Sequence, residues 1–121
     1  MLFINLLKLI KSFNYAFKGI GHTLSSQQNF RVHVLAVIVV CIVGWYVKLL
    51  PWEWVALVLC FGMVLAMELI NTAIEYLTNL VEPDFNPLAG KVKDAAAGAV
   101  LIAAISSVLV AIIIFGRHFF V

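Results

Sequence analysis

The chain has 121 residues, the size of a single domain, so we expect one domain over residues 1–121. Hydrophobic residues make up 64% of it and charged residues only 12%, against about 25% in a typical soluble domain. This excludes an ordinary water-soluble domain and predicts a surface that mostly faces lipid. The formal net charge of +2 gives no reason to expect a nucleic-acid partner.

Residues 1–28 are expected to form an amphipathic helix and the connection that follows it. Apolar residues recur every three or four positions from Phe3 to Leu24, and lysines follow the same spacing on the opposite face. That pattern is typical of a helix lying in the membrane interface, where its lysines meet anionic lipid headgroups. An ordinary amphipathic helix of a soluble protein is the alternative.

Three long apolar runs follow and predict membrane-spanning helices at residues 30–50, 53–81 and 92–117. A bilayer core of about 30 Å requires about 20 helical residues. The first and third runs are long enough alone. The second is long enough only if its polar C-terminal half lies at or near the cytoplasmic face. Residues 82–91 contain two prolines and a glycine and are expected to form the one substantial loop.

The basic residues predict how these helices are oriented. Two of them, Lys48 and Arg117, fall on one side of the predicted spans. The other six fall on the opposite side: Lys8, Lys11, Lys18, Arg31, Lys91 and Lys93. Because cytoplasmic segments are enriched in lysine and arginine, we expect the N-terminus and the loop at 82–94 in the cytoplasm and the C-terminus outside.

The second span ends in a polar stretch that is the main candidate for chemistry. Glu68, Asn71, Glu75 and Glu82 are spaced by three, four and seven residues, which places them near one helical face. An ionisable side chain inside a bilayer costs at least about 2.5 kcal/mol, so it calls for a partner or a function. His33, near the start of the first span, is expected to be a packing residue of the interface rather than a ligand.

Carboxylates in this position suit phosphoryl transfer to a lipid alcohol. One carboxylate can accept a proton from a hydroxyl group, and a second can bind magnesium together with nucleotide phosphates. The neighbouring Lys93 and Asp94 add a cation that can neutralise phosphate charge. Two alternatives remain: the glutamates are simply solvated at a helix end, or the chain is a non-enzymatic transport or assembly protein whose polar groups serve an ion path.

Two sequence blocks carry a resemblance to a known family. Residues 68–75 read ELINTAIE, and residues 91–100 read KVKDAAAGAV. Together with YAFKG at 15–19 and NFRVH at 29–33, they resemble the prokaryotic diacylglycerol kinase family, which includes the undecaprenol kinases. The resemblance covers nearly the whole chain in the same order. It implies an all-α integral membrane fold of the bacterial cytoplasmic membrane, with a surface helix and three transmembrane helices per subunit.

The resemblance also implies ATP as co-substrate, Mg²⁺ as cofactor, a membrane lipid as substrate and a homotrimer with active sites at subunit boundaries. Glu68 matches the general base, Glu75 a magnesium ligand and Asn71 the residue that arranges this carboxylate pair. The remaining matches are nucleotide-contacting positions: Lys8, Tyr15, Asp84, Phe85, Asn86, Lys93 and Asp94.

One position departs from the family pattern. Where the family commonly has a second metal-binding glutamate, this chain has Gln27, whose carbonyl can bind magnesium but brings no charge. This substitution leaves open the alternative that the chain is a family member that binds nucleotide but has weak catalytic turnover. Residues 81–89 and 93–100 look more like the undecaprenol kinase branch, so undecaprenol is slightly favoured over diacylglycerol as the substrate.

Overall fold

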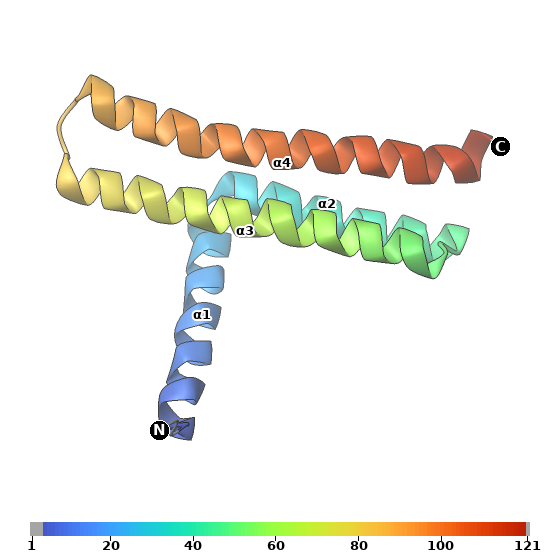
Figure 1. Cartoon of the computed structure of the whole chain (residues 1–121), viewed down its shortest axis with the longest axis horizontal. Coiled ribbons are helices and arrows are strands. Elements are labelled where there is room, and N and C mark those ends of the chain that lie inside the picture. The colour runs from blue at the N-terminus through green and yellow to red at the C-terminus, as the bar shows by residue number, and fades with distance from the viewer. Residues whose placement is uncertain (1–3, 121) are drawn as a thin grey trace.

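A computed structural model describes residues 4–120 of the chain. Residues 1–3, which begin the expected surface helix, and Val121 lie outside this range. The described part is helical without strands and has the order α1 (Leu6–Ser26), α2 (Gln28–Val47), α3 (Pro51–Val81) and α4 (Pro87–Phe120). Helices α2, α3 and α4 run side by side, and α1 projects away from them (Figure 1).

The junction between α1 and α2 is a single extended residue, Gln27. The guanidinium of Arg31 donates hydrogen bonds to the carbonyls of Leu24 and Ser25, at 3.1 and 2.9 Å. These carbonyls belong to the last turn of α1, where no intrahelical partner is available. Arg31 thereby satisfies the end of one helix from the start of the next and stabilises the sharp change of direction seen in Figure 1.

The turn between α2 and α3 is short and close-packed. Lys48 ends α2 in the left-handed conformation, with φ of 57°, and Pro51 begins α3 at the first helical position, where its missing N–H costs nothing. A Cβ on Gly44 would lie 2.7 Å from Leu49 and 2.9 Å from Trp54. Only glycine therefore allows α2 to approach the start of α3 this closely.

Helix α4 begins earlier than the sequence indicates. Residues 82–91 were expected as a loop, but the structure confines the connection to residues 82–86 and starts α4 at Pro87. The side chain of Asn86 accepts a hydrogen bond from the backbone N–H of Leu88 at 2.9 Å, which caps the helix. The proline was interpreted as a loop residue, whereas in this context it occupies the first turn of a helix, where proline is favoured.

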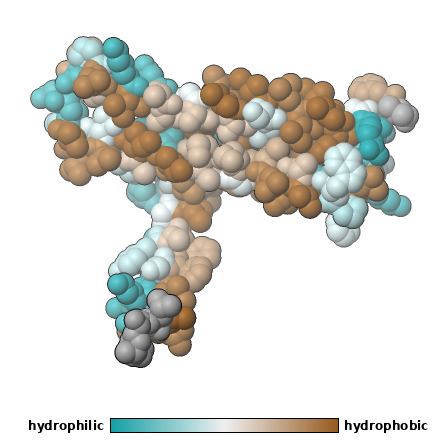
Figure 2. All heavy atoms as spheres, viewed as in Figure 1, coloured by the Kyte–Doolittle hydropathy of each residue, from teal (hydrophilic) through white to brown (hydrophobic). Residues whose placement is uncertain are grey.

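Three helices of the described chain are long and apolar enough to cross a membrane: α2, α3 and α4, as expected. Helix α3 has 31 residues and α4 has 34, so at 1.5 Å per residue they are about 46 and 51 Å long and exceed a bilayer core of about 30 Å. Figure 2 shows apolar residues over most of the bundle, with hydrophilic ones gathered at its two ends.

The end of the bundle near the C-terminus contains a buried polar pair. Glu53, in the first turn of α3, is 0% exposed, and both of its carboxylate oxygens lie near Nε2 of His118 on α4, at 2.9 and 3.1 Å. Glu53 also accepts a hydrogen bond from the N–H of Leu50. The small core of Leu49, Leu57 and Ile114 lies beside this pair and joins the same ends of α3 and α4.

Candidate active site

The candidate site is built on the C-terminal half of α3, between Glu68 and Asn79. No proline interrupts this stretch and glycine is absent, so the helix continues unbroken from the apolar half into the polar half. Side chains three and four residues apart lie on one face of a helix. The face therefore presents Glu68, then Asn71 and Thr72, then Glu75 in successive turns, as the sequence predicts.

Glu68 is one of the two buried members of this face, together with Thr72. Its residue is 3% exposed, and its Oε1 lies 3.3 Å from Nε2 of His33 on α2. Thr72, also buried, donates its hydroxyl hydrogen bond to the backbone carbonyl of Glu68 and leaves the carboxylate free for other contacts. His33, expected to be a packing residue of the interface rather than a ligand, is the side chain placed against the candidate base.

Asn71 and Glu75 form the next pair along the helix. Nδ2 of Asn71 donates a hydrogen bond to Oε1 of Glu75 at 3.2 Å. This contact orients the amide so that its oxygen points elsewhere, and that oxygen is buried without a hydrogen-bond partner in the described chain. A buried acceptor without a donor is costly, so it marks a position where a ligand can bind.

Lys93 on α4 is brought to the same end of the molecule. Its ammonium group donates a 2.6 Å hydrogen bond to Oδ1 of Asn79 on α3. Asn79 follows Glu75 by one helical turn, which is about 6 Å along the axis. The Lys93 ammonium therefore contacts α3 one turn beyond Glu75, and the adjacent Asp94 is exposed.

The end of α1 contacts α3 at Tyr76. Nε2 of His22 lies 3.2 Å from the hydroxyl of Tyr76, and the hydroxyl of Ser26 lies 3.5 Å from it. Because Tyr76 follows Glu75 directly and Gln27 follows Ser26 directly, the α1–α2 junction lies beside the Glu75 region. No hydrogen bond in residues 4–120 joins the Gln27 side chain to Glu75.

Other expected site residues are not gathered around Glu68 within one chain. Tyr15 and Lys8 precede His22 by seven and fourteen residues, or about 10 and 21 Å along α1, on the part of the helix that leaves the bundle. Asp84 and Phe85 lie in the connection before α4, where Phe85 is 96% exposed. Asn86 is engaged as the cap of α4.

The oxygen ligands around Glu75 are of the type that a hard cation prefers, but they are few. Carboxylate and amide oxygens are the ligands that magnesium takes, and Asn71 offers a buried oxygen without a partner next to the Glu75 carboxylate. Among residues 4–120, no three histidine, cysteine or acidic side chains gather closely enough to hold a metal ion. Magnesium usually completes its shell with waters and substrate phosphates, which suits such a sparse protein set.

A protein-family model described as prokaryotic diacylglycerol kinase matches residues 14–115, which include α2, α3 and most of α1 and α4, together with Glu68, Glu75 and Lys93. The chain belongs to the prokaryotic diacylglycerol kinase family. The expected family is therefore confirmed, and with it the assignment to lipid kinases.

Curated relatives within this family carry two names. The undecaprenol kinase of Bacillus subtilis is 40% identical over 108 residues, covering 89% of this chain and 88% of the relative. The diacylglycerol kinase of Synechocystis is 38% identical over 103 residues, covering 84% of this chain and 59% of that longer protein. The diacylglycerol kinase of Escherichia coli K12 is 28% identical over 112 residues, covering 93% and 92%.

Sequence reasoning missed two contacts of the site. An ionisable residue such as His33 inside an apolar helix is itself a signal of function, but its partner lies on another helix and is not visible in the spacing. The contact of His22 with Tyr76 was missed for the same reason. Both histidines connect α3 to the helices that precede it.

Proposed function

We propose that this protein is an ATP-dependent lipid kinase that transfers the γ-phosphoryl group to the hydroxyl of a membrane lipid alcohol at the cytoplasmic face. The observation that carries the proposal is the buried carboxylate of Glu68, one turn from the Asn71–Glu75 pair, in a member of the prokaryotic diacylglycerol kinase family. The cation of Lys93 reaches the same stretch of α3 from α4.

Glu68 acts as the general base in this proposal. Its carboxylate lies at the apolar end of the polar face, where a lipid hydroxyl would arrive from the bilayer. A positioned carboxylate that accepts the hydroxyl proton contributes about 10²–10⁴-fold to such a reaction. The buried position keeps water from competing with the lipid as acceptor.

Glu75 and Asn71 are the residues that hold magnesium, with Gln27 as a neutral third ligand. When bound, the metal neutralises charge on the phosphates and helps to align the reacting groups. Asn71 contributes independently of the metal, because its amide fixes one oxygen of Glu75 through a hydrogen bond.

Lys93 donates hydrogen bonds to the phosphates of ATP. Asp94, the next residue of α4, lies at the same phosphates. Asn79 holds the Lys93 ammonium in place until the nucleotide binds. In the proposal, Asp84, Phe85 and Asn86 border the nucleotide from the α3–α4 connection. Lys8 and Tyr15 complete its binding site from a neighbouring subunit, since they lie far along α1 from Glu68 within one chain.

The helix lengths support the proposed placement in the membrane. Helix α2 has 20 residues, so at 1.5 Å per residue its length matches a bilayer core of about 30 Å, and α1 leaves the bundle at its first residue. In Figure 2 hydrophobic and hydrophilic residues gather on different sides of the projecting helix, which supports an interfacial position for α1. The basic residues favour the cytoplasmic side for this end.

Undecaprenol is the favoured lipid and a homotrimer the favoured assembly. The 40% identical relative is named undecaprenol kinase, whereas the 28% identical Escherichia coli relative is named diacylglycerol kinase. Most large apolar side chains on α2, α3 and α4 are exposed in the single chain, which leaves surface for lipid and for further copies.

The test is side-by-side phosphorylation of undecaprenol and diacylglycerol by protein in lipid, with labelled ATP and magnesium. We expect label on both, faster on undecaprenol, and a loss of at least about 10²-fold in the Glu68→Gln variant. Label on neither lipid refutes the kinase. Magnesium-dependent ATP binding without transfer would favour instead a nucleotide-binding member with weak turnover, for which the neutral Gln27 is the specific observation.

A further inference from the structure

His33 is a polar side chain in an otherwise apolar stretch of α2. Helix α2 has no charged residue between Arg31 and Lys48, and its residues there are nearly all apolar. An imidazole placed among them gives up hydration, and it is retained only where a partner compensates. The partner is on α3, where Oε1 of Glu68 lies 3.3 Å from His33 Nε2.

The two side chains of this contact differ in their exposure. The side chain of Glu68 is 5% exposed, and that of His33 is 26% exposed. The carboxylate therefore depends on the imidazole, because little water reaches it and Thr72 bonds only to its backbone.

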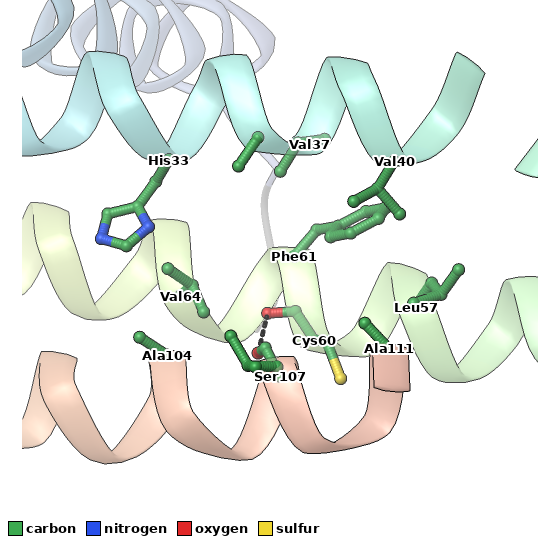
Figure 3. A pocket seen from close by; sticks show the side chains of 12 residues that line it. His33, Val37, Val40, Leu57, Cys60, Phe61, Val64, Ala104, Ser107 and Ala111 are labelled. Atoms are coloured by element: carbon green, nitrogen blue, oxygen red, sulfur yellow. Dashed lines mark hydrogen bonds between the residues drawn. The ribbon is translucent and has the colours of Figure 1, made fainter. Parts of the chain in front are cut away.

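His33 also lines an apolar cavity of about 150 Å³ between α2, α3 and α4, whereas Glu68 does not. Figure 3 shows the His33 ring reaching from α2 toward α3 beside Val64, with Leu57 and Ala111 farther along the cavity. Most of the lining side chains are apolar. His33 thus supplies a hydrogen-bonding group next to the candidate base in otherwise apolar surroundings.

We propose that His33 is a positioning residue that holds the Glu68 carboxylate in the orientation in which it accepts the proton of the lipid hydroxyl. This inference rests on the proposed kinase function and deepens it. In the proposed arrangement, Nε2 of His33 approaches one carboxylate oxygen, Oε1, at 3.3 Å, and the second oxygen faces the substrate. His33 touches neither the lipid nor ATP, so its removal affects the chemical step more than binding.

The matched variants are His33→Gln and His33→Leu. Glutamine keeps an N–H donor at a reach close to that of Nε2, whereas leucine removes the donor and remains compatible with the apolar cavity. We expect His33→Leu to lower kcat by about 10–100-fold, the usual effect of losing a group that orients a functional side chain, with KM for lipid and ATP within about twofold of the original protein. His33→Gln restores most of kcat.

Leu35→Ala, on the exposed side of the same helix, controls for general disturbance of α2 and keeps normal kinetics. Equal kcat in His33→Leu and the unaltered protein overturns the proposal. So does a rise in KM as large as the fall in kcat, or a failure of His33→Gln to recover activity while the variant assembles normally.

A readout independent of turnover separates this inference from the proposed function. The ¹⁵N signal of His33 Nε2, assigned by its loss in His33→Gln, is compared between the unaltered protein and Glu68→Gln by magnetic resonance in lipid. We expect a protonated, hydrogen-bonded Nε2 that shifts when Glu68 loses its charge. If the shift occurs but no lipid is phosphorylated, the kinase proposal fails and the contact stands; if lipid is phosphorylated and Nε2 does not respond, the positioning role fails.

Discussion

At the scale of single residues, Gln27 is the position where the sequence is expected to depart from the family pattern. It stands at the α1–α2 junction, next to Ser26, which contacts Tyr76 beside Glu75. A neutral amide there leaves the carboxylate of Glu75 as the only charged side chain proposed to bind magnesium. Each carboxylate that reaches a divalent cation adds attraction that an amide oxygen lacks.

We therefore predict that Gln27→Glu lowers the magnesium concentration for half-maximal activity by about tenfold, or roughly 1.4 kcal/mol. The measurement is a magnesium titration of lipid phosphorylation at saturating ATP. Gln28→Glu, which adds the same charge at the next, exposed position, is the matched control and should shift the titration much less. Equal titrations for all three proteins would show that residue 27 is not a ligand.

At the scale of helices, the end of the bundle near the C-terminus and the end that carries the candidate site are held by different contacts. Glu53 and His118 join the first turn of α3 to the last turns of α4. Fifteen residues separate Glu53 from Glu68, which corresponds to about 22 Å along α3. The buried pair should therefore contribute to stability and leave the chemical step nearly unaffected.

The prediction is that Glu53→Ala lowers the free energy of unfolding by about 3 kcal/mol, because His118 then loses its partner and the N–H of Leu50 its acceptor. His118→Ala should destabilise the fold in the same way. The double variant should cost about 1–3 kcal/mol less than the two single effects combined, because the partners are in direct contact. Equilibrium unfolding in mixed micelles gives these values, and additive effects would refute the pairing. For variants that remain folded, kcat should stay close to that of the original protein.

The elements themselves were largely predictable from the sequence. Long apolar runs predict α2, α3 and α4 because only helices satisfy their own backbone in lipid. The shared face of Glu68, Asn71 and Glu75 follows from the helical period alone. The start of α4 was predicted too late, because Pro87 is equally compatible with a loop and with a first helical turn, and Asn86 decides between them.

The contacts between helices were not predictable in the same way. His33 with Glu68, Lys93 with Asn79 and His118 with Glu53 each join two helices. Periodicity assigns each residue to a face of its own helix, but it does not say how far one helix is shifted along the next. Those shifts are set by packing, such as the close approach of Gly44 to Trp54, and they determine which polar groups meet.

At the scale of the whole molecule, one chain brings together the candidate base Glu68, the Asn71–Glu75 pair and Lys93, but not the expected nucleotide contacts of α1. Helix α1 extends away from the bundle (Figure 1), so in the proposed trimer Lys8 and Tyr15 act at the site of a neighbouring copy. The single chain alone is then an incomplete catalyst. Activity should require an assembly, which native mass spectrometry would detect at three times the 13.4 kDa chain.

We predict that two inactive or weak variants restore each other when their subunits are mixed. One carries Glu68→Gln, and the other carries Lys8→Ala with Tyr15→Ala. Mixed assemblies contain sites where an intact α1 from the first variant meets an intact Glu68 from the second, so their activity should exceed the average of the two separate preparations. Subunits are mixed by co-expression with two different tags and sequential purification, and lipid phosphorylation is measured at equal protein. Activity no higher than that average would place Lys8 and Tyr15 with the Glu68 of their own chain, or outside the site altogether.

A second mixture, of Glu68→Gln chains with Glu75→Gln chains, is the control. Both residues lie on one face of α3, two turns apart, so every site built from a single α3 keeps one defect. Activity should therefore not recover in this mixture.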